Sequence, residues 1–262
     1  MLDISISKNI LTAYGLISRK PVQSRIEANK TLGIRFIHPC GEIIEADVAN
    51  IFSTQRNTVL AKNNNCICLT EHFMAAAACA NLTNVDVFLD AEELPFADGS
   101  AMFWFDFFTE HFHSSPLKTF VFKEEIKIID ESDASRYILL QPAQEFSASY
   151  QLISNHNYLK TQSYTWNQNL PCSDLLRART FSSYSENQIL GLENWVLGFD
   201  DNGFKQDLFF DNEPARHKLL DLIGDLYLSG FNPLALKAKI TSVKAGHELN
   251  SRMAKKIKEV LS

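Results

Sequence analysis

A histidine and an aspartate lie four residues apart in the run His217-Lys218-Leu219-Leu220-Asp221. On a helix, this spacing points an imidazole and a carboxylate in the same direction. Together they offer two of the three protein ligands that a catalytic zinc ion needs. The chain must then supply a third ligand, a base and an acid, and two other segments have suitable side chains: Glu71-His72 and Gly246-His247.

The helix expected from Pro214 to Ser229 has an apolar face and a polar face. His217, Asp221 and Asp225 recur at every fourth position of the polar face. A solvated surface with a few ion pairs is the competing interpretation of that pattern. Gly224 argues against it, because a glycine inside a helix costs about 1 kcal/mol relative to alanine. We therefore expect another part of the protein to approach this helix closely at Gly224.

Glu71 and His72 stand at the start of a predicted helix that follows a strand. Side chains at adjacent helical positions diverge by a quarter-turn or more, so one can bind a metal while the other reaches a water on it. The alternative is an acidic residue favoured by the helix dipole beside a histidine that only packs. The similar run 110–113 has no following carboxylate, and we interpret it as surface. For His247, the alternative is an ordinary turn residue after a glycine.

Composition favours a soluble globular protein. The 262 residues are 45% hydrophobic and 21% charged, with a formal net charge of −6, which disfavours broad nucleic-acid binding. The five cysteines are odd in number and form no Cys-x-x-Cys pair, so reduced thiols are favoured over disulfides. Residues 1–20 lack the pattern of a signal peptide, and no apolar run is long enough to span a membrane. We expect a cytoplasmic protein, and a lipid-bearing substrate is compatible with that location.

Each half of the chain has strands followed by helices, which predicts two α+β domains. The expected domains are 1–115, with Glu71 and His72, and 116–262, with the zinc helix and His247. Because the candidate ligands are divided between them, we expect the site in the cleft between the domains. The expected helices are 71–82, 101–112, 173–180, 214–229 and 248–261, and the expected strands are short segments within 3–68, then 85–89, 120–129, 136–142, 145–153, 195–199 and 207–210.

Read with their neighbours, these residues resemble the UDP-3-O-acyl-N-acetylglucosamine deacetylase family. The resemblance runs in family order from about residue 50 to the C-terminus. Its motifs are Thr70-Glu71-His72-Phe73-Met74-Ala75-Ala76, Asn84-Val85, Leu94-Pro95, Asp98-Gly99-Ser100-Ala101, Ala178-Arg179-Thr180-Phe181, the run from Arg216 to Leu226, and Lys244-Ala245-Gly246-His247-Glu248-Leu249-Asn250.

The resemblance implies a zinc enzyme of lipid A biosynthesis that removes acetate from the glucosamine nitrogen of an acylated UDP-sugar. It implies two α/β sandwiches with helices layered between the two sheets. It also suggests a monomer, with peripheral contact to membrane-bound steps of the pathway. By this resemblance, His72, His217 and Asp221 would bind the zinc. Glu71 would be the general base, and His247, oriented by Asp225, would be the acid or cationic stabiliser. Thr180 would donate to the oxyanion, Lys218 would contact the nucleotide's phosphates, and Lys123 and Phe181 would make further substrate contacts.

The sequence departs from the family pattern in three places. Near the N-terminus, Ile17 and Arg19 stand where the family has a histidine and a glycine. Residues 182–190 leave little room for the family's inserted helix, and residues 51–68 look trimmed. We therefore expect a shortened, open or absent acyl passage. The alternatives are a related deacetylase acting on a short-acyl or different N-acetylated sugar, and a non-catalytic UDP-sugar-binding relative, which the complete set of site residues disfavours.

Overall fold

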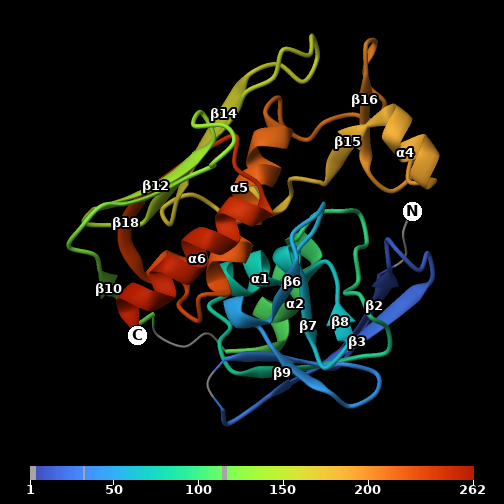
Figure 1. Cartoon of the computed structure of the whole chain (residues 1–262). Coiled ribbons are helices and arrows are strands. Elements are labelled where there is room, and N and C mark those ends of the chain that lie inside the picture. Colours follow the sequence, from blue (N-terminus) through green and yellow to red (C-terminus); the bar gives the residue numbers. More distant parts are fainter. Residues whose placement is uncertain (1–3, 32, 114–116) are drawn as a thin grey trace.

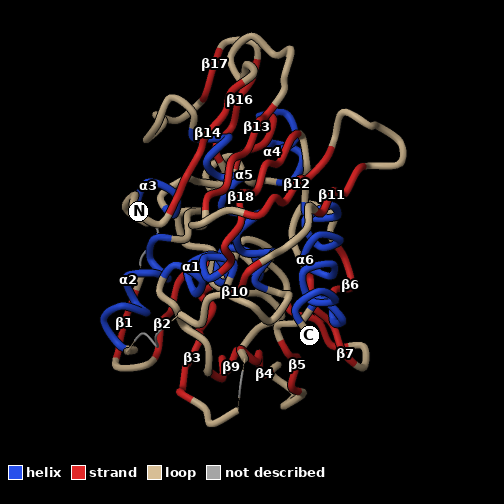
Figure 2. Tube along the Cα trace, turned by 90° about the vertical axis from the view of Figure 1, so that its left-hand side faces the viewer, coloured by secondary structure: helices blue, strands red, loops and turns tan. Residues whose placement is uncertain are grey.

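The computed structural model describes residues 4–31, 33–113 and 117–262. Two large sheets form the outer layers, and the main helices lie between them (Figure 1). The same layering is visible after a quarter-turn, with strands above and below a helical middle (Figure 2). The predicted mixed α+β fold with helices layered between sheets is therefore confirmed.

The first sheet has the strand order β1-β2-β3-β9-β4-β5. All of its pairings are antiparallel except the one between β4 and β9. The central strand β9 occupies the predicted positions, and its residues alternate between buried and half-buried, with both valines buried. The strands are β1 Ser5–Ser7, β2 Ile10–Tyr14, β3 Pro21–Ala28, β4 Ile34–Ile37, β5 Ile43–Glu45 and β9 Val85–Leu89.

The second sheet has the order β11-β12-β18-β13-β14, with β10 also paired to β18. Its centre is β18, which is antiparallel to β12 and parallel to β13. Neither β18 nor β14 was expected from the sequence, and the strand expected over 120–129 is divided into β10 and β11. The strands are β10 Phe120–Val121, β11 Ile126–Ile129, β12 Tyr137–Pro142, β13 Ser147–Leu152, β14 Gln162–Asn167 and β18 Leu236–Val243.

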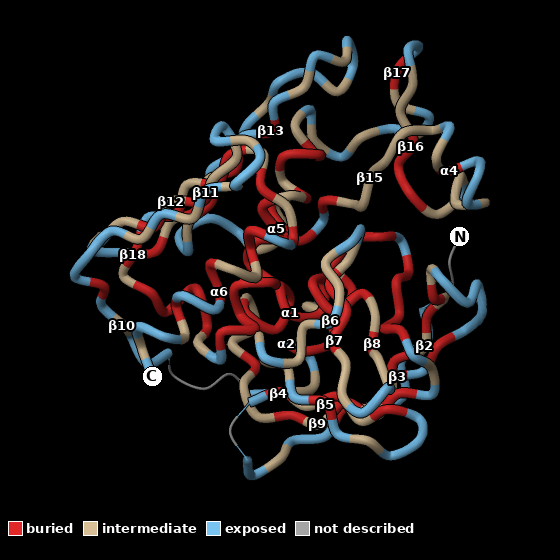
Figure 3. The backbone as a smooth tube through the Cα atoms, viewed as in Figure 1, coloured by how far each residue is buried: buried red, intermediate tan, exposed pale blue. Residues whose placement is uncertain are grey.

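The helices α1 (Thr70–Cys79) and α5 (Glu213–Tyr227) pack against each other in the centre of the molecule. Alanines 75–78 are all buried and allow this close approach. A Cβ at Gly224 would overlap the Glu71 carbonyl oxygen and would lie 3.1 Å from the Ala75 nitrogen. The expected close approach at Gly224 is thus made by the backbone of α1. Figure 3 shows the buried core running through both helices.

Two further helices complete the helical layer. The aromatic-rich α2 (Met102–His111) packs on α1, and α6 (His247–Leu261) packs on α5 and on the second sheet. The core is continuous across the layers, because buried residues of both sheets and of all four helices belong to one hydrophobic cluster. The α1–α5 contact therefore fixes the first residues of α1 relative to the first turns of α5.

A small strand–helix–strand unit follows Thr180. It consists of β15 (Phe181–Ser183), α4 (Tyr184–Leu190) and β16 (Leu197–Asp200), with β15 parallel to β16 and β17 (Gly203–Phe204) at the edge. The expectation that 182–190 leaves little room for a helix was wrong. The Ser183 hydroxyl caps α4 by accepting from the Glu186 amide, and Gly191 ends it in the left-handed conformation.

A second small sheet stands beside the first residues of α1. It is formed by β6 (Ile51–Ser53), β7 (Val59–Lys62) and β8 (Asn65–Ile67), and it follows a short 3-10 helix, η1 (Val48–Asn50). A similar short helix, η2 (Pro233–Ala235), precedes β18. The connection between β6 and β7 turns back toward α1, which brings residue 58 to the α1 N-terminus.

Two other local predictions need correction. Residues 207–210 form no strand, because the buried Glu213 carboxylate binds the Phe209 amide and the Arg179 side chain and folds this segment into a turn. The helix expected over 173–180 ends early, as α3 (Ser173–Leu176).

The expected domain boundary at 115/116 lies outside the described residues, so the division into two domains stays a prediction. In the described part of the chain, no helix is long and apolar enough to cross a membrane.

Candidate metal centre

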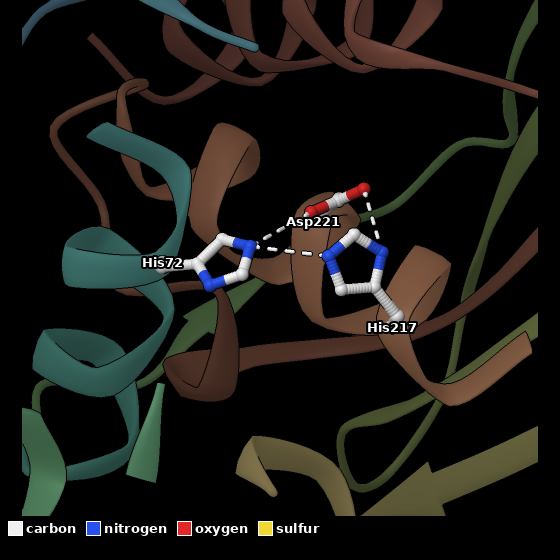
Figure 4. A group of neighbouring side chains, drawn as sticks. All are labelled: His72, His217 and Asp221. Carbon is white, nitrogen blue, oxygen red and sulfur yellow. Dashed lines mark hydrogen bonds and ion pairs between the residues drawn. The ribbon is translucent and has the colours of Figure 1, made fainter. Parts of the chain in front are cut away.

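His72 of α1 meets His217 and Asp221 of α5 in one buried group (Figure 4). The Nε2 atoms of the two histidines are 3.1 Å apart. His72 Nε2 lies 3.7 Å from Asp221 Oδ1, and His217 Nδ1 lies 3.5 Å from Asp221 Oδ2. Each residue offers one ligand atom, and these atoms all lie within 4.8 Å of one another. Within the described residues, this is the group whose composition and spacing suit a metal ion.

The protonation states of the three side chains also suit a cation. Burial lowers the pKa of both histidines, so both imidazoles are neutral near pH 7. The Ser100 carbonyl, 3.3 Å from His72 Nδ1, accepts the proton there and leaves the lone pair on Nε2. Burial alone would raise the pKa of Asp221, but the positive charges of Lys218 and His247 beside it outweigh burial and lower that pKa. Two neutral imidazoles and one carboxylate are thus available.

The separation of the two histidine nitrogens is close to that found around a bound metal ion. Two ligand nitrogens bound ~2.0–2.1 Å from one tetrahedral ion lie about 3.3 Å apart, close to the histidine separation here. Asp221 Oδ1 and His217 Nδ1 are buried without a hydrogen-bond partner among the described residues. An unsatisfied buried carboxylate oxygen is costly unless something charged compensates it. The donor set therefore fits a divalent metal ion.

Glu71 precedes the ligand His72 and is also buried. Its Oε2 accepts a hydrogen bond from the Thr58 amide at 3.0 Å. Burial raises the pKa of Glu71 to about 7, with Asp221 and Asp225 adding to the shift and His247 opposing it. A carboxylate with a pKa near the working pH is an effective proton acceptor. Leu69, just before α1, has a positive φ of 64°, so this helix begins from a strained residue.

His247 begins α6 and forms a pair with Asp225 of α5. His247 Nδ1 lies 2.8 Å from Asp225 Oδ2, and its Nε2 lies 3.9 Å from Asp221 Oδ2. Burial opposes the charged imidazolium, but Asp225 and Asp221 outweigh it and raise the pKa of His247 to about 9. The imidazole is therefore protonated at neutral pH, and its Nε2 side is turned toward the metal-ligand group.

Thr180 and Phe181 lie beside the two histidines of the metal-ligand group. The Thr180 hydroxyl is 3.1 Å from His217 Nε2 and 3.5 Å from His72 Nε2, and it donates to the Gly99 carbonyl at 3.2 Å. The Phe181 ring meets the His217 ring edge-on, with centroids 5.7 Å apart. A polar hydroxyl and an aromatic wall thus border the two imidazoles.

The two predicted substrate lysines differ in position. Lys218 Nζ lies 2.8 Å from Asp221 Oδ2, and its side chain is about one-quarter exposed. It therefore joins the group from the surface side. Lys123 is exposed and lines a separate cavity with Glu124 and Lys256, away from the metal-ligand group. The remaining predicted site residues lie together, and Lys123 is the one that the structure does not bring to them.

Three buried residues that contact the site were not singled out from the sequence. Thr58 binds Glu71 and Asp225, Asn250 donates to Asp225 at 2.8 Å, and Tyr150 donates to the Ala245 carbonyl at 2.6 Å just before His247. Asn250 ends the last family-like motif, so a signal for it existed. Thr58 and Tyr150 carry no local pattern that marks a functional residue.

Comparisons with known proteins identify the family of the chain. The family described as UDP-3-O-acyl N-acetylglycosamine deacetylase matches residues 6–259. Among similar proteins named UDP-3-O-acyl-N-acetylglucosamine deacetylase, that of Helicobacter hepaticus is 29% identical, covering 94% of this chain and 86% of its own length. The Leptospira biflexa protein is 30% identical over 94% and 85%, and the Chlamydia abortus protein is 32% identical over 89% and 88%. The chain therefore belongs to the UDP-3-O-acyl N-acetylglycosamine deacetylase family.

Proposed function

We propose that this protein is a zinc-dependent hydrolase that removes acetate from the glucosamine nitrogen of a UDP-3-O-acyl-N-acetylglucosamine in lipid A biosynthesis. The observation that carries the proposal is the buried His72, His217 and Asp221 group, which has Glu71 and the His247–Asp225 pair beside it. Amide hydrolysis needs a base, an acid and stabilisation of a developing oxyanion, and this group contains residues suited to each task.

His72, His217 and Asp221 would hold the metal. Two histidines and one carboxylate are a ligand set used by catalytic zinc, which keeps a position open for water or substrate. When bound, zinc polarises a carbonyl oxygen and lowers the pKa of water to about 7. Lys218 partly neutralises Asp221 before the ion binds, which reduces the repulsion between buried carboxylates.

Glu71 and His247 would move the protons. Glu71, with a pKa of about 7, accepts a proton from the attacking water. His247, with a pKa of about 9, is charged at neutral pH, so it stabilises negative charge and can protonate the departing amine nitrogen. Because its Nδ1 is bound to Asp225, the proton that it delivers comes from Nε2.

The other predicted residues would bind substrate. Thr180 can donate to the oxyanion once its hydroxyl rotates away from the Gly99 carbonyl. Phe181 lies against both His217 and Lys218, so it can pack on the sugar. Lys218 reaches the surface and can contact the nucleotide's phosphates. Lys123, in its separate cavity, could contact only a distant part of the nucleotide.

One observation favours a second candidate, a related deacetylase that prefers a short acyl group. The helix α4 has seven residues, and two arginines from the first half of the chain hold it. Arg56 pairs with Glu186 at 2.7 Å, and Arg19 donates to the Leu190 carbonyl. Arg19 has a φ of 55° and stands where the family has a glycine. A long acyl chain would have less room beside a helix held in this way.

An acyl-length panel tests the proposal. Acetate release is measured on UDP-N-acetylglucosamine and on its 3-O-acyl derivatives with chains from short to long. The main proposal predicts release from an acylated substrate, and the second candidate predicts a maximum at short chains. Absence of release from every member, by protein that carries zinc, would favour the non-catalytic alternative. The cytoplasmic location and the monomeric state stay predictions.

A further inference from the structure

A buried threonine connects the proposed base to the proposed acid. Thr58 lies just before β7 and is 1% exposed. Its amide donates to Glu71 Oε2 at 3.0 Å, and its hydroxyl lies 2.6 Å from Asp225 Oδ1. The residues it joins are far apart in the chain, since 167 positions separate Thr58 from Asp225. One residue of the β6–β7 connection thus contacts both Glu71, the proposed base, and Asp225, the partner of the proposed acid His247.

The direction of each hydrogen bond around Asp225 follows from which of the bonded groups carry a proton. An ionised Asp225 accepts only, so the Thr58 hydroxyl donates its single proton to Oδ1. His247 Nδ1 and Asn250 Nδ2 both donate to Oδ2, each at 2.8 Å. Asp225 is therefore held by three donors from two segments, the β6–β7 connection and the first turn of α6. Among the described residues, Thr58 is the donor that satisfies Oδ1, and Asp225 is 0% exposed.

The backbone around Thr58 holds the start of α1 in the same way. Asn57 Oδ1 accepts from the Leu69 amide at 3.2 Å, and the Thr58 carbonyl accepts from the Thr70 hydroxyl at 3.0 Å. With the Thr58 amide bound to Glu71, two consecutive residues anchor Leu69 and the first two residues of α1. These contacts also hold Leu69 in its left-handed conformation.

We propose that Thr58 is a positioning residue for the deacetylation. Its hydroxyl fixes the rotamer of Asp225, and Asp225 in turn fixes the orientation of the His247 ring, with Nε2 facing the metal-ligand group. Its backbone amide independently fixes Glu71. The proposal rests on the proposed function, because it assigns Thr58 to the acid–base pair of that reaction. Thr58 itself is not one of the metal-ligand residues, and its role is exerted through Asp225, His247 and Glu71.

Side-chain variants separate the hydroxyl from the backbone. Thr58→Val keeps the shape and the amide but removes the hydroxyl, whereas Thr58→Ser keeps the hydroxyl. We expect Thr58→Val to lower kcat about 10- to 100-fold, the range typical of residues that orient a ligand or catalytic group, with KM and zinc content unchanged. Thr58→Ser is expected to recover most of that loss. A Thr58→Val enzyme with kcat within twofold of wild type, or a Thr58→Ser enzyme as impaired as Thr58→Val, would overturn the proposal.

A matched control tests whether loss of any buried hydroxyl has this effect. Ser242 lies in β18 and is 0% exposed, and its hydroxyl has no hydrogen-bond partner in the part of the chain that the structure describes. Ser242→Ala is expected to leave kcat unchanged. An equal loss in both variants would show a general packing effect and would refute the specific role of Thr58. If Thr58→Val does not fold, Thr58→Ala replaces it. The smaller side chain leaves room for a water to bind Asp225, which favours folding. Because the threonine hydroxyl is still missing, a lower kcat is again expected.

Two further measurements distinguish this proposal from the proposed function. In a His247→Gln background, Thr58→Val should change kcat by less than twofold, because its effect passes through His247, and additive losses would contradict the proposal. In metal-free protein, NMR of the His247 ring nitrogens should show the Nδ1 proton in wild type and a weakened or shifted signal in Thr58→Val. An unchanged signal would also overturn the proposal. This spectrum needs no turnover, so it stays informative even if no acetate is released.

Discussion

Gly224 of α5 packs directly on the carbonyl group of Glu71 in α1. A side chain at Gly224 would overlap that carbonyl, and the carbonyl belongs to backbone that cannot rotate away. The contact sets the spacing at which His72 on one helix meets His217 and Asp221 on the other. The glycine therefore serves the metal-ligand group although it offers no ligand.

Replacing Gly224 with alanine tests this relationship. Higher helix propensity should stabilise the variant by about 1 kcal/mol. Overlap with fixed backbone typically costs 1–3 kcal/mol or more, so we expect net destabilisation and weaker metal binding. Urea unfolding and metal titration measure the two effects. Lys255→Ala, on the exposed side of α6, is the control and should change stability by less than about 0.5 kcal/mol. A Gly224→Ala protein as stable as wild type would contradict the close-contact argument.

Metal analysis should find about one zinc per chain. His217→Ala is expected to lose it, because two ligands hold the ion far less well than three. His156→Ala is the matched control, since His156 lies in a different region beside Asp201 and should leave zinc content unchanged. Removing zinc should also lower the free energy of unfolding by ~3 kcal/mol when free zinc had been at 100 times its Kd. Metal-free wild-type protein that folds and releases acetate would exclude zinc catalysis.

Glu71→Ala separates the base from the ligands. Glu71 accepts from the Thr58 amide and is not one of the grouped ligand atoms, so the variant should keep its zinc. Loss of a general base typically costs 10²–10⁴-fold, and we expect kcat to fall within that range. His72→Ala is the comparison and should lose both zinc and activity. Retained activity in Glu71→Ala would mean that another group takes the proton.

The dependence of kcat/KM on pH should be bell-shaped. Activity requires an ionised Glu71, so it rises as pH increases through that pKa of about 7, and it requires a charged His247, so it falls as pH increases through about 9. A bound divalent cation favours the ionised carboxylate and disfavours the imidazolium, which moves both limbs to lower pH. His247→Gln should abolish the alkaline limb. A profile in which that limb persists would reassign it to another group.

The sequence predicted the elements whose signals are local. The helix α5 begins close to its proline and carries a regular apolar face, and α1 contains a run of alanines, so both were recognised nearly in full. The central strand β18 was missed because its identity depends on pairing with β12 and β13, whose paired residues lie 92 to 106 positions earlier in the chain. The segment 207–210 has the alternation of a strand, but the buried Glu213 binds its backbone instead.

The residues of the candidate site also divide into those with a local signal in the sequence and those that depend on contacts between distant residues. His217 and Asp221 were found because helical spacing places them together, and resemblance to the family supplied the other residues. Thr58 could not be found from its neighbours in sequence, because its partner Asp225 lies 167 positions away and only the packing of the β6–β7 connection on α1 and α5 brings them together. The position of Lys123 also depends on tertiary structure. The sequence predicted it beside the site, but it lines a separate cavity.

The pairing of His72 with His217 closes a long loop, because 145 positions separate the two residues. A link between such distant points removes much of the conformational freedom of the unfolded chain, and a covalent link over about 100 residues is credited with ~4–5 kcal/mol. An ion shared by these histidines acts as a reversible link of this kind. Metal supply would then affect how much folded protein a cell retains, in addition to how fast each folded molecule works.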